Sequence, residues 1–234
     1  MKNTFLFLAL VLISTTPLTS CKKKGCTDIN AVNYNEKAKK DDGSCLYVPT
    51  ISIIGAADTS ISVGTTYNDP GATAVNKDGT SVNVTVDNQV DATTTGTYEI
   101  TYTATNANGT ATAKRTVNVV VGQDNWTVTW DVSSNCGTAF PLAATPSVSA
   151  GSSANTLIID NMFNLVGGTA NATINGATIT IPQQTVNITV GDVIFSGIGT
   201  MNAQGNILTI TYTYENTTPL IGGSGTCVAT YVKQ

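Results

Sequence analysis

The positions of the five cysteines constrain this chain more than any other feature of its sequence. Cys21 follows directly on an apolar N-terminal run. The other four fall as two pairs inside separate segments, Cys26 with Cys45 and Cys136 with Cys227. Disulfides form and persist mainly in oxidising compartments outside the cytoplasm. The spacing therefore predicts an exported chain built from separate small domains, with two disulfides.

Residues 1–20 have the organisation of an export signal. A positively charged start at Lys2 is followed by a short apolar run, 5–13, and then by small residues. That run is too short for a membrane-spanning helix, which takes roughly 20 apolar residues. The stretch Leu18-Thr19-Ser20-Cys21 resembles the lipobox of bacterial lipoproteins, in which the cysteine thiol receives a diacylglycerol and the signal is cleaved before it. The resemblance implies that Cys21 is lipidated. The alternative is an ordinary signal peptide that ends at a stray cysteine.

Three lysines after this motif, Lys22, Lys23 and Lys24, complete a predicted lipidated tether of residues 21–24. Beside a lipid anchor they would either touch anionic headgroups or form a solvated spacer. Lysine rather than aspartate at position 22 favours the outer membrane, by analogy with the sorting rules of bacteria with two membranes. The acidic residues that mark surface export in some Bacteroidetes lipoproteins do not follow Cys21. The sequence therefore allows either the cell surface or the periplasmic face.

Beyond the signal, the composition predicts an all-β fold. Charged residues make up 11% of the chain, and residues that favour strands and tight turns dominate it. The chain contains no histidine, which excludes a Ser-His-Asp or Cys-His pair and any histidine metal site. The net charge of −4 argues against a nucleic-acid partner, because phosphate binding takes clustered Lys and Arg.

We therefore expect no enzymatic activity. Four acids of the C-terminal segment could in principle supply a carboxylate pair for glycoside cleavage. They are Asp131, Asp160, Asp192 and Glu215. Nothing in their spacing brings two of them together, and single surface acids are the usual explanation.

Residues 25–47 predict a small module closed by a disulfide. The stretches Gly25-Cys26-Thr27-Asp28 and Asp41-Asp42-Gly43-Ser44-Cys45, with Asn33-Tyr34-Asn35 between them, resemble a short repeat of secreted and surface proteins of Flavobacteria and their relatives. A segment this small cannot bury a useful core and needs a staple. A bridge between its two cysteines closes a loop of about 20 residues and stabilises it by roughly 3 kcal/mol in the chain-entropy model.

The same module carries oxygen donors that suit calcium. They are Asp28, Asn33, Asn35, Asp41 and Asp42. Their spacing is not that of an EF-hand loop, and Asp-Asp-Gly is also an ordinary turn sequence. Two interpretations stay open: a calcium-binding module with Asp28, Asp41 and Asp42 among the ligands, or a disulfide spacer that needs no ion.

Residues 49–121 alternate apolar and polar side chains with the period of β-strands. The clearest strand is 97–105, in which alternate residues from Tyr98 to Ala104 are apolar. Further alternating runs are 51–53, 61–63, 82–86 and 111–121. Asn108-Gly109 predicts a hairpin turn. About seven short strands in some 70 residues predict a β-sandwich.

Two stretches of this segment, Asp69-Pro70-Gly71-Ala72 and 96–109, resemble the bacterial surface Ig-like domain. That module also occurs on some insecticidal crystal toxins and is related to the HYR type of cell-adhesion module. The resemblance implies a non-catalytic role in spacing, adhesion or presentation of neighbouring domains. Many members carry aspartate where Asn106 stands, which implies weaker binding of any cation there. Tyr98 is either the tyrosine whose hydroxyl ties a sandwich corner or an ordinary core tyrosine.

Residues 125–234 predict a second β-domain. The run from Trp126 to Val132 alternates apolar and polar residues as on one strand. Asn175-Gly176, between two strand-like runs, is the strongest hairpin signal of the chain. The remaining strand-like runs are 157–159, 172–174, 177–181, 193–199, 206–215 and 227–232.

The cysteines of this domain favour a meander. Cys136 follows the first predicted strand, and Cys227 starts the last. In an up-and-down meander with an even number of strands, the first and last strands meet side by side and antiparallel. A bridge between the two cysteines would then close a small barrel or a strongly curled sheet. Asn161-Met162-Phe163 and 179–184 resemble meander domains at the ends of Bacteroidetes lipoproteins, relatives to which we attach no activity.

These features together predict an outer-membrane lipoprotein of Bacteroidetes or Flavobacteria type. Its Ig-like sandwich would present the C-terminal domain as a non-catalytic structural, adhesion or domain-presenting module. The alternative is a ligand-binding lipoprotein whose barrel holds a carbohydrate or a small apolar ligand, with Trp126, Trp130 and Phe163 stacking on a sugar. Tryptophans two residues apart on a predicted strand are more often core residues. The expected partners are the membrane and, beyond it, carbohydrate or other surface proteins.

Overall fold

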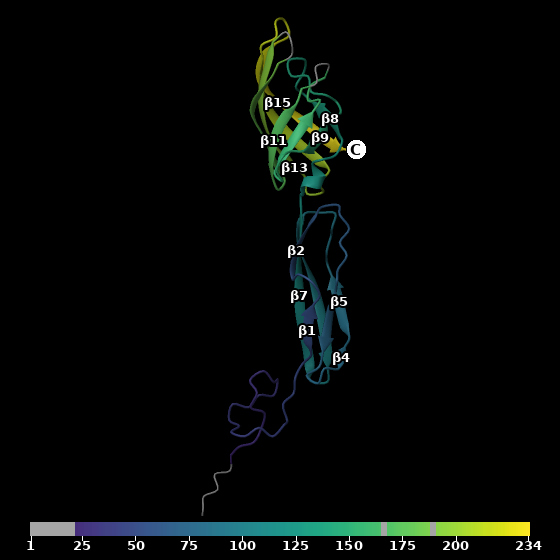
Figure 1. The fold of residues 1–234 in the computed structure, drawn as a ribbon, viewed down its shortest axis with the longest axis vertical. Coiled ribbons are helices and arrows are strands. Elements are labelled where there is room, and N and C mark those ends of the chain that lie inside the picture. Colours follow the sequence, from purple (N-terminus) through teal and green to yellow (C-terminus); the bar gives the residue numbers. More distant parts are fainter. Residues whose placement is uncertain (1–21, 165–167, 188–190) are drawn as a thin grey trace, which may run out of the picture.

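The computed structural model describes residues 22–164, 168–187 and 191–234. Three parts follow one another along an elongated molecule (Figure 1): a small N-terminal module without strands of its own, a narrow sandwich and, at the far end, a curled sheet. In the described part of the chain, no helix is both long and apolar enough to cross a membrane.

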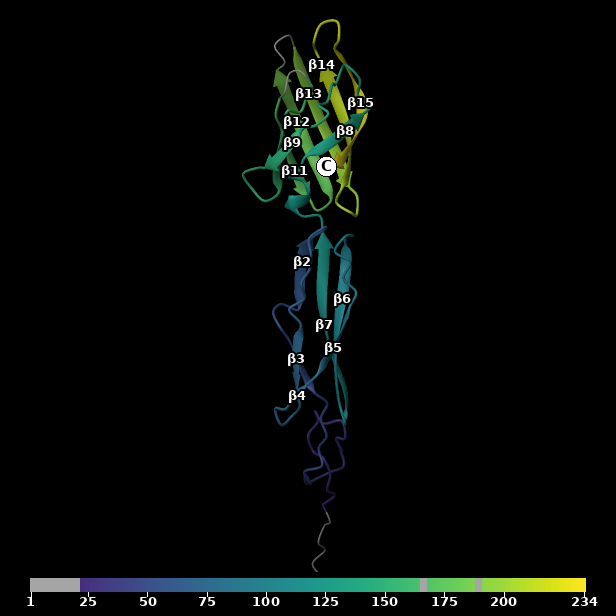
Figure 2. The same ribbon diagram turned by 90° about the vertical axis from the view of Figure 1, so that its right-hand side faces the viewer.

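The sandwich contains seven strands in two sheets. One sheet has the order β1-β3-β4 and consists of β1 (Thr50–Ile53), β3 (Ala72–Val75) and β4 (Ser81–Val82). The other has the order β2-β7-β6-β5 and consists of β2 (Asp58–Ser62), β5 (Val84–Asn88), β6 (Gly96–Asn106) and β7 (Gly109–Val120) (Figure 2). β2 runs parallel to β7, and the other pairs are antiparallel. The predicted sandwich is confirmed.

The long hairpin β6–β7 supplies the core of the sandwich. Ile100 and Tyr102 on β6 and Val117 on β7 are fully buried. Ile51 and Ile53 of β1 pack against them. Successive side chains of a strand point to opposite faces, so the alternation in the sequence selects the face of β6 that is buried.

Residues 82–86, predicted as one strand, are divided between the two sheets. Val82 ends β4, which pairs with β3, and Val84 begins β5, which pairs with β6. The chain therefore changes sheet at Asn83. Alternation identifies strand-like residues but carries no information about where a chain crosses from one sheet to the other.

Tyr98 belongs to a corner of the sandwich. Its hydroxyl donates a hydrogen bond to the backbone carbonyl of Thr94, four residues upstream, at 2.8 Å. This is the bond that defines a tyrosine corner, so of the two interpretations of Tyr98 the corner tyrosine is the one observed.

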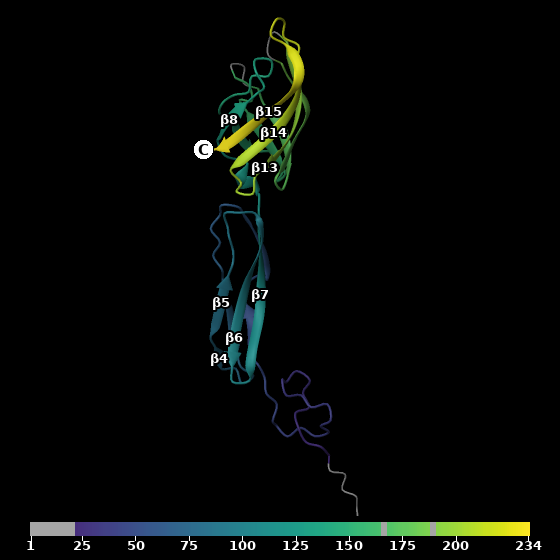
Figure 3. The same cartoon turned by 180° about the vertical axis from the view of Figure 1, so that it is seen from behind.

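The C-terminal domain is one eight-stranded antiparallel sheet in the order β8-β15-β14-β13-β12-β11-β10-β9. Its strands are β8 (Trp130–Ser134), β9 (Ser147–Ala150), β10 (Thr156–Asp160), β11 (Ala170–Asn175), β12 (Thr178–Asn187), β13 (Asp192–Met201), β14 (Ile207–Asn216) and β15 (Gly223–Lys233). The first and last strands lie side by side, as the meander prediction requires, and the sheet curls into a half-barrel (Figure 3). An isolated bridge between Thr129 and Ser147 connects the chain just before β8 to the start of β9.

Aromatic side chains fill the interior of the half-barrel. The ring of Phe140 lies against those of Phe163, Phe195 and Tyr212, with centroids 5.1, 5.6 and 5.2 Å away. All four side chains are buried. At these residues the interior is packed core, which contacts between aromatic rings, edge-on between Phe140 and Phe163, stabilise beyond their buried area.

The first strand of this domain begins later than the sequence predicts. A 3-10 turn, η1 (Gln123–Asn125), precedes it, and the N–H groups of Trp126 and Thr127 both donate to the carbonyl of Gln123, at 3.0 and 3.2 Å. β8 begins only at Trp130. The alternation from Trp126 onward is therefore a strand pattern only in its second half, because local helical hydrogen bonds hold its first half in a turn.

Candidate functional site

Cys21, the predicted lipidation site, lies outside the described residues, and its lipidation stays a prediction. The other four cysteines are paired in the predicted way, Cys26 with Cys45 and Cys136 with Cys227, with Cα atoms 4.8 and 4.9 Å apart. The second bridge ties the loop after β8 to β15. It therefore locks the first strand of the C-terminal sheet to the last.

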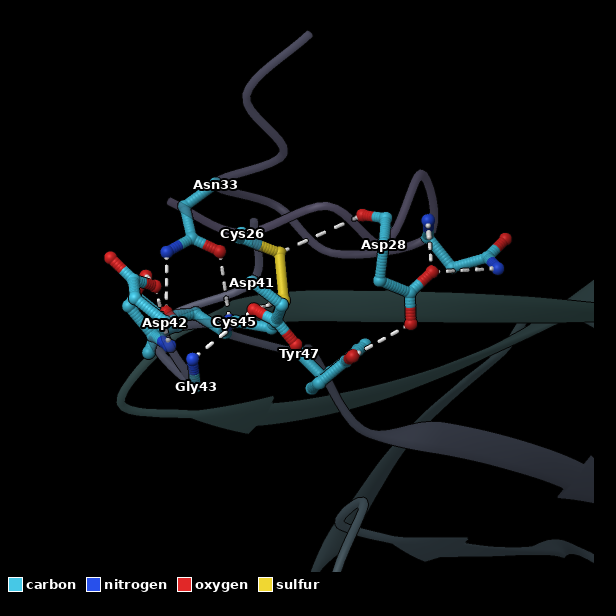
Figure 4. Close-up of a disulfide and its surroundings, with 11 residues drawn as sticks. Cys26, Asp28, Asn33, Asp41, Asp42, Gly43, Cys45 and Tyr47 are labelled. Carbon is cyan, nitrogen blue, oxygen red and sulfur yellow. Dashed lines mark hydrogen bonds between the residues drawn. A yellow bond between two sulfur atoms is a disulfide. The ribbon is translucent and has the colours of Figure 1, made fainter. Parts of the chain in front are cut away.

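The N-terminal module is built from turns around its disulfide (Figure 4). Asn33 joins two of these turns: its Oδ1 accepts from the N–H of Leu46 at 2.8 Å, and its Nδ2 donates to the carbonyl of Ser44 at 2.6 Å. Cys26 is buried, so the module has a minimal core formed mainly by the disulfide itself.

The three aspartates predicted as calcium ligands are engaged in separate hydrogen bonds. Oδ2 of Asp28 accepts from the hydroxyl of Tyr47 at 2.7 Å, and this bond lowers the pKa of Asp28. Oδ1 of Asp41 and Oδ1 of Asp42 each accept from the backbone N–H two residues on, as in ordinary Asx turns. Within the described ranges, no three acidic or cysteine side chains gather as a metal site requires. Each of the three carboxylates thus accepts from a turn or a tyrosine hydroxyl, and calcium binding by this module stays a prediction.

Trp126 and Trp130, the residues predicted to stack on a sugar, are each only 1% exposed. Nε1 of Trp130 donates to the carbonyl of Trp126 at 3.1 Å, and the Trp130 ring meets Tyr231 edge-on at a centroid distance of 6.5 Å. Phe163 is buried as well. None of these three rings offers a face to solvent, so the stacking assignment is corrected: they are core residues, the alternative that their spacing also allowed.

The four acids considered for catalysis lie on four different strands. Asp131 is on β8, Asp160 on β10, Asp192 on β13 and Glu215 on β14. Asp192 and Glu215 are on neighbouring strands, but Glu215 pairs with Ile194, two positions further along β13. Oδ1 of Asp192 is engaged by Nδ2 of Asn187 at 2.9 Å. The described geometry provides no pair of carboxylates that converge on one cleft.

A buried ionic network, absent from the sequence predictions, lies inside the sandwich. Arg115 on β7 is 2% exposed, and its Nε lies 3.2 Å from Oδ1 of Asp69 and 3.0 Å from the hydroxyl of Tyr102. The Tyr102 hydroxyl donates to the same Asp69 oxygen at 2.6 Å. The terminal guanidinium nitrogens donate to the backbone carbonyls of Ile54, Ala56 and Gly71.

This network fastens two loops to the β6–β7 hairpin. The carbonyls that Arg115 binds belong to the connections between β1 and β2 and between β2 and β3. Burial raises the pKa of Tyr102. Burial alone would lower the pKa of Arg115, but its hydrogen bond with Tyr102 and the nearby negative charges raise it. The charge is fixed, fully bonded and inaccessible, so its role is structural.

Polar contacts join the N-terminal module to one end of the sandwich. Nδ2 of Asn106 donates to the backbone carbonyl of Tyr47 at 2.9 Å and to Oδ1 of Asn76 at 2.8 Å. Nδ2 of Asn108 donates to the same Tyr47 carbonyl at 3.1 Å. The ammonium of Lys77 lies 4.9 Å from the centroid of the Tyr47 ring. Asn106 thus uses a side-chain donor at the position where the resemblance implied an aspartate.

The other end of the sandwich shares a buried core with the C-terminal domain. Val63 belongs to the same hydrophobic cluster as Trp126. Asn125 is 5% exposed, and its Nδ2 donates to the carbonyl of Val63 at 2.8 Å. The hairpin glycine Gly205 makes room for this contact, since a Cβ there would lie 2.5 Å from Cγ1 of Val63. Residues 122–125, which connect the sandwich to the C-terminal domain, therefore form a packed junction.

The end of the molecule far from the N-terminal module carries the loop between β14 and β15 (Figure 1). Leu220 in this loop is fully exposed and Ile221 is 55% exposed. Leu220 also has φ = +74°, a backbone region that residues other than glycine rarely adopt. Nδ2 of Asn216 donates to the carbonyl of Ala139 at 2.9 Å and holds the base of the loop.

A groove of about 540 Å³ lies at the base of this loop, on the outer side of β13, β14 and β15. Its lining combines polar and apolar surface in similar amounts, and its polar residues include Ser196, Thr213, Glu215, Ser224 and Thr226. Hydroxyl groups and one carboxylate suit a polar ligand. The half-barrel therefore offers space for a ligand on its outer surface, whereas its interior is filled where the aromatic rings pack.

Comparison with known proteins identifies the central part of the chain. Residues 51–119 match the family described as bacterial surface protein, Ig-like domain. A search of curated protein sequences gives no significant match. Among solved structures, the chain is similar to the crystal structure of the lipoprotein BT2262 from Bacteroides thetaiotaomicron, at 18% identity, covering 80% of this chain and 100% of that chain. The TM-score is 0.31, which is too low to carry an argument about fold or function. The matched residues span strands β1 to β7 almost end to end, so the sandwich is similar to bacterial surface Ig-like domains.

Proposed function

We propose that this protein is a lipid-anchored, non-catalytic spacer that holds its C-terminal domain away from the outer membrane of a bacterial cell. The export signal and the lipobox-like residues that end at Cys21 support an anchor at the N-terminal end. The sandwich matches a family of bacterial surface proteins, which supports exposure at the cell surface. The exposed loop around Leu220 lies at the opposite end of the molecule (Figure 1).

The observation that carries this proposal is the packed junction at Val63, Asn125 and Gly205. Domains of one chain move relative to one another by default, unless their interface is large and hydrophobic. Here the two domains share one hydrophobic cluster, and a buried amide bonds across the boundary. The sandwich and the half-barrel should therefore move as one stiff body, which is what a spacer requires.

The anchor is tested by the variant Cys21→Ala. Several acyl chains hold a protein stably, because each buried methylene contributes about 0.8 kcal/mol. We expect the wild-type protein in the membrane fraction and the variant in the soluble exported fraction. An antibody against the C-terminal domain should label intact cells that carry the wild-type protein. Unchanged membrane partition of Cys21→Ala would reject the anchor.

The stiffness is tested by small-angle X-ray scattering on residues 22–234. Gly205→Leu forces a side chain against Val63, while Gly176→Leu is a matched control. Both glycines lie in hairpins at positive φ, but a Cβ at Gly176 meets nothing within 4 Å. We expect only Gly205→Leu to shorten the largest dimension and broaden the distribution of shapes. Scattering from the unmodified chain that already requires many bent shapes would contradict the proposal.

A second candidate function is carbohydrate binding by the half-barrel, favoured by the hydroxyl-lined groove near Glu215. Sugars would bind there through hydrogen bonds to Thr213 and Ser224 rather than by stacking on the buried tryptophans. A glycan array probed with residues 22–234 tests it. We expect bound glycans to be lost with Thr213→Val and Ser224→Ala together, and retained with Thr200→Val on another part of the same sheet.

A further inference from the structure

The N-terminal module brings two lysine runs together. The chain from Lys23 to Gly25 lies beside Lys39 and Lys40: the N–H of Lys39 donates to the carbonyl of Lys23 at 2.8 Å, and the N–H of Gly25 donates to the carbonyl of Lys40 at 3.2 Å. A parallel bridge joins Lys24 to Lys40. Runs that are 15 residues apart in sequence thus form one surface, the lysine patch. It consists of Lys22, Lys23, Lys24, Lys39 and Lys40, all exposed.

The acids of the module neutralise this patch only in part: hydrogen bonds from Ser44 and the charge of Lys24 lower the pKa of Asp42, which therefore lies near one edge of the patch. Asp28 is bonded to Tyr47, on the side of the module that meets the sandwich. Asp41 and Asp42 are bound into the turn that follows Lys40, and Glu36 is exposed. Six lysines against four acids leave residues 22–47 with a net charge of +2.

The rest of the molecule has the opposite charge. Residues 48–124 carry three basic and seven acidic side chains, and residues 125–234 carry one basic and four acidic side chains. The positive end of the elongated molecule is therefore the end at which the predicted anchor is attached (Figure 1). A charge separation of this kind orients a molecule at a negatively charged surface.

The tether leaves the patch little freedom. Four residue steps separate Cys21 from Gly25, and a fully extended chain spans about 3.5 Å per residue, so the module would lie within about 14 Å of the acylated cysteine. This step rests on the lipid anchor of the proposed function. At that distance the lysines reach the headgroup layer, while the acidic sandwich and half-barrel stand beyond a Debye length of about 8 Å.

We propose that the lysine patch docks on anionic phospholipid headgroups of the bilayer that holds the anchor. The acyl chains retain the protein in the membrane, and the patch sets its direction: the lysines are drawn to the phosphates while the acidic sandwich is repelled. A basic patch beside an acyl anchor is a recognised second signal for membrane attachment. The disulfide-stapled module then lies on the membrane surface and keeps the sandwich and the half-barrel pointing away from it.

The test uses residues 22–234 without acyl chains, so that binding depends on the patch alone. Vesicles of phosphatidylcholine, with and without phosphatidylglycerol, are sedimented with the protein at low and at high salt. We expect binding only to the vesicles that contain phosphatidylglycerol, and release by salt. Lys39→Glu with Lys40→Glu should reduce binding at least about tenfold, since each charge near the surface contributes appreciably. Lys114→Glu with Lys233→Glu changes the charge equally, away from the patch, and should leave binding unchanged.

Mass spectrometry of the Cys26–Cys45 disulfide and the melting temperature establish that each double variant is folded. Equal binding to both kinds of vesicle, or an equal loss in both double variants, would overturn the docking. If the protein without acyl chains binds no vesicles while the acylated protein still partitions into the membrane, docking of the lysine patch is refuted and the lipid anchor of the proposed function is retained. Loss of membrane partition in the variant Cys21→Ala, which cannot be acylated, tests the anchor separately.

Discussion

The buried network of Arg115 permits a quantitative test of what holds the sandwich together. Asp69→Ala removes the carboxylate that contacts the guanidinium and leaves a cation that is 2% exposed, with hydrogen bonds but, among the described residues, without a counter-charge. Breaking a buried ion pair by removing one partner costs about 3–5 kcal/mol. The Asp69 side chain is itself 13% exposed, so water can replace part of it. We expect a loss in the free energy of unfolding near the lower limit, about 3 kcal/mol.

Arg115→Met removes the charge but orphans the carbonyls of Ile54, Ala56 and Gly71. Each buried acceptor left without a partner costs about 1–3 kcal/mol, so we expect a total loss of at least about 3 kcal/mol. Combined with Asp69→Ala, it should cost less than the sum of the single variants by about 1–3 kcal/mol, because the second change removes a partner that is already lost.

Urea unfolding of residues 22–234 measures these changes, with hydrogen exchange of peptides from 50–121 to localise them. Tryptophan fluorescence would miss them, because Trp126 and Trp130 both belong to the C-terminal domain. The exposed pair of Lys114 and Glu99 is a control on the same hairpin, with Nζ and Oε1 2.7 Å apart. Glu99→Ala should cost less than about 1 kcal/mol. If Asp69→Ala lowers the free energy of unfolding no more than Glu99→Ala does, the buried ion pair does not stabilise the sandwich.

Three further predictions follow from other contacts. Asn106→Asp replaces the amide that donates to the Tyr47 carbonyl by a carboxylate, which can only accept. Limited proteolysis between the N-terminal module and the sandwich should therefore be faster, and added calcium should restore protection. Unchanged cleavage would contradict this. Burial raises the pKa of Tyr212 and of Tyr231 above the ordinary value of 10.0. The folded state then holds protons that the unfolded chain releases. The two tyrosines should therefore leave the free energy of unfolding unchanged between neutral pH and about pH 9 and lower it above about pH 10, less steeply in Tyr231→Phe. Urea titrations at alkaline pH with equal slopes in both proteins would refute this. Replacing Cys136 and Cys227 by serine should destabilise the C-terminal domain by about 4.5 kcal/mol, measured by tryptophan fluorescence; a loss below about 1 kcal/mol would show that the bridge does not restrict the unfolded chain.

Local patterns predicted a large part of this fold. The alternation from Tyr98 to Ala104 identifies both the strand β6 and its buried face, because the two faces of a strand repeat with a period of two. The meander topology followed from Cys136 and Cys227, since a bridge between the first and last strands requires those strands to be neighbours. Such constraints act within one strand or through one covalent bond, which makes them visible in the sequence.

Features that depend on contacts between several distant segments could not be predicted from the sequence. Lys114-Arg115 has the appearance of a solvated pair, and nothing local indicates that Arg115 is bound by carbonyls from two loops. The sequence signal that was available is the presence of Asp69 and Tyr102 in the two stretches that resemble the Ig-like domain. The turn at Trp126 was not predicted because the residues from Trp126 onward alternate as in a strand. Local hydrogen bonds to the carbonyl of Gln123 nevertheless hold them in a turn.

The bond between Cys136 and Cys227 has a mechanical consequence for a protein under tension. A pull applied between the two ends of the molecule enters the half-barrel at Trp130, where β8 begins, and would peel β8 from β15 one hydrogen-bonded pair at a time. The sulfur bridge lies just beyond the last residue of β8, so this peeling stops after a single strand. Further force then passes through the disulfide into the middle of β15. There it would load the hydrogen bonds between β15 and β14 in parallel, so that they would have to break together.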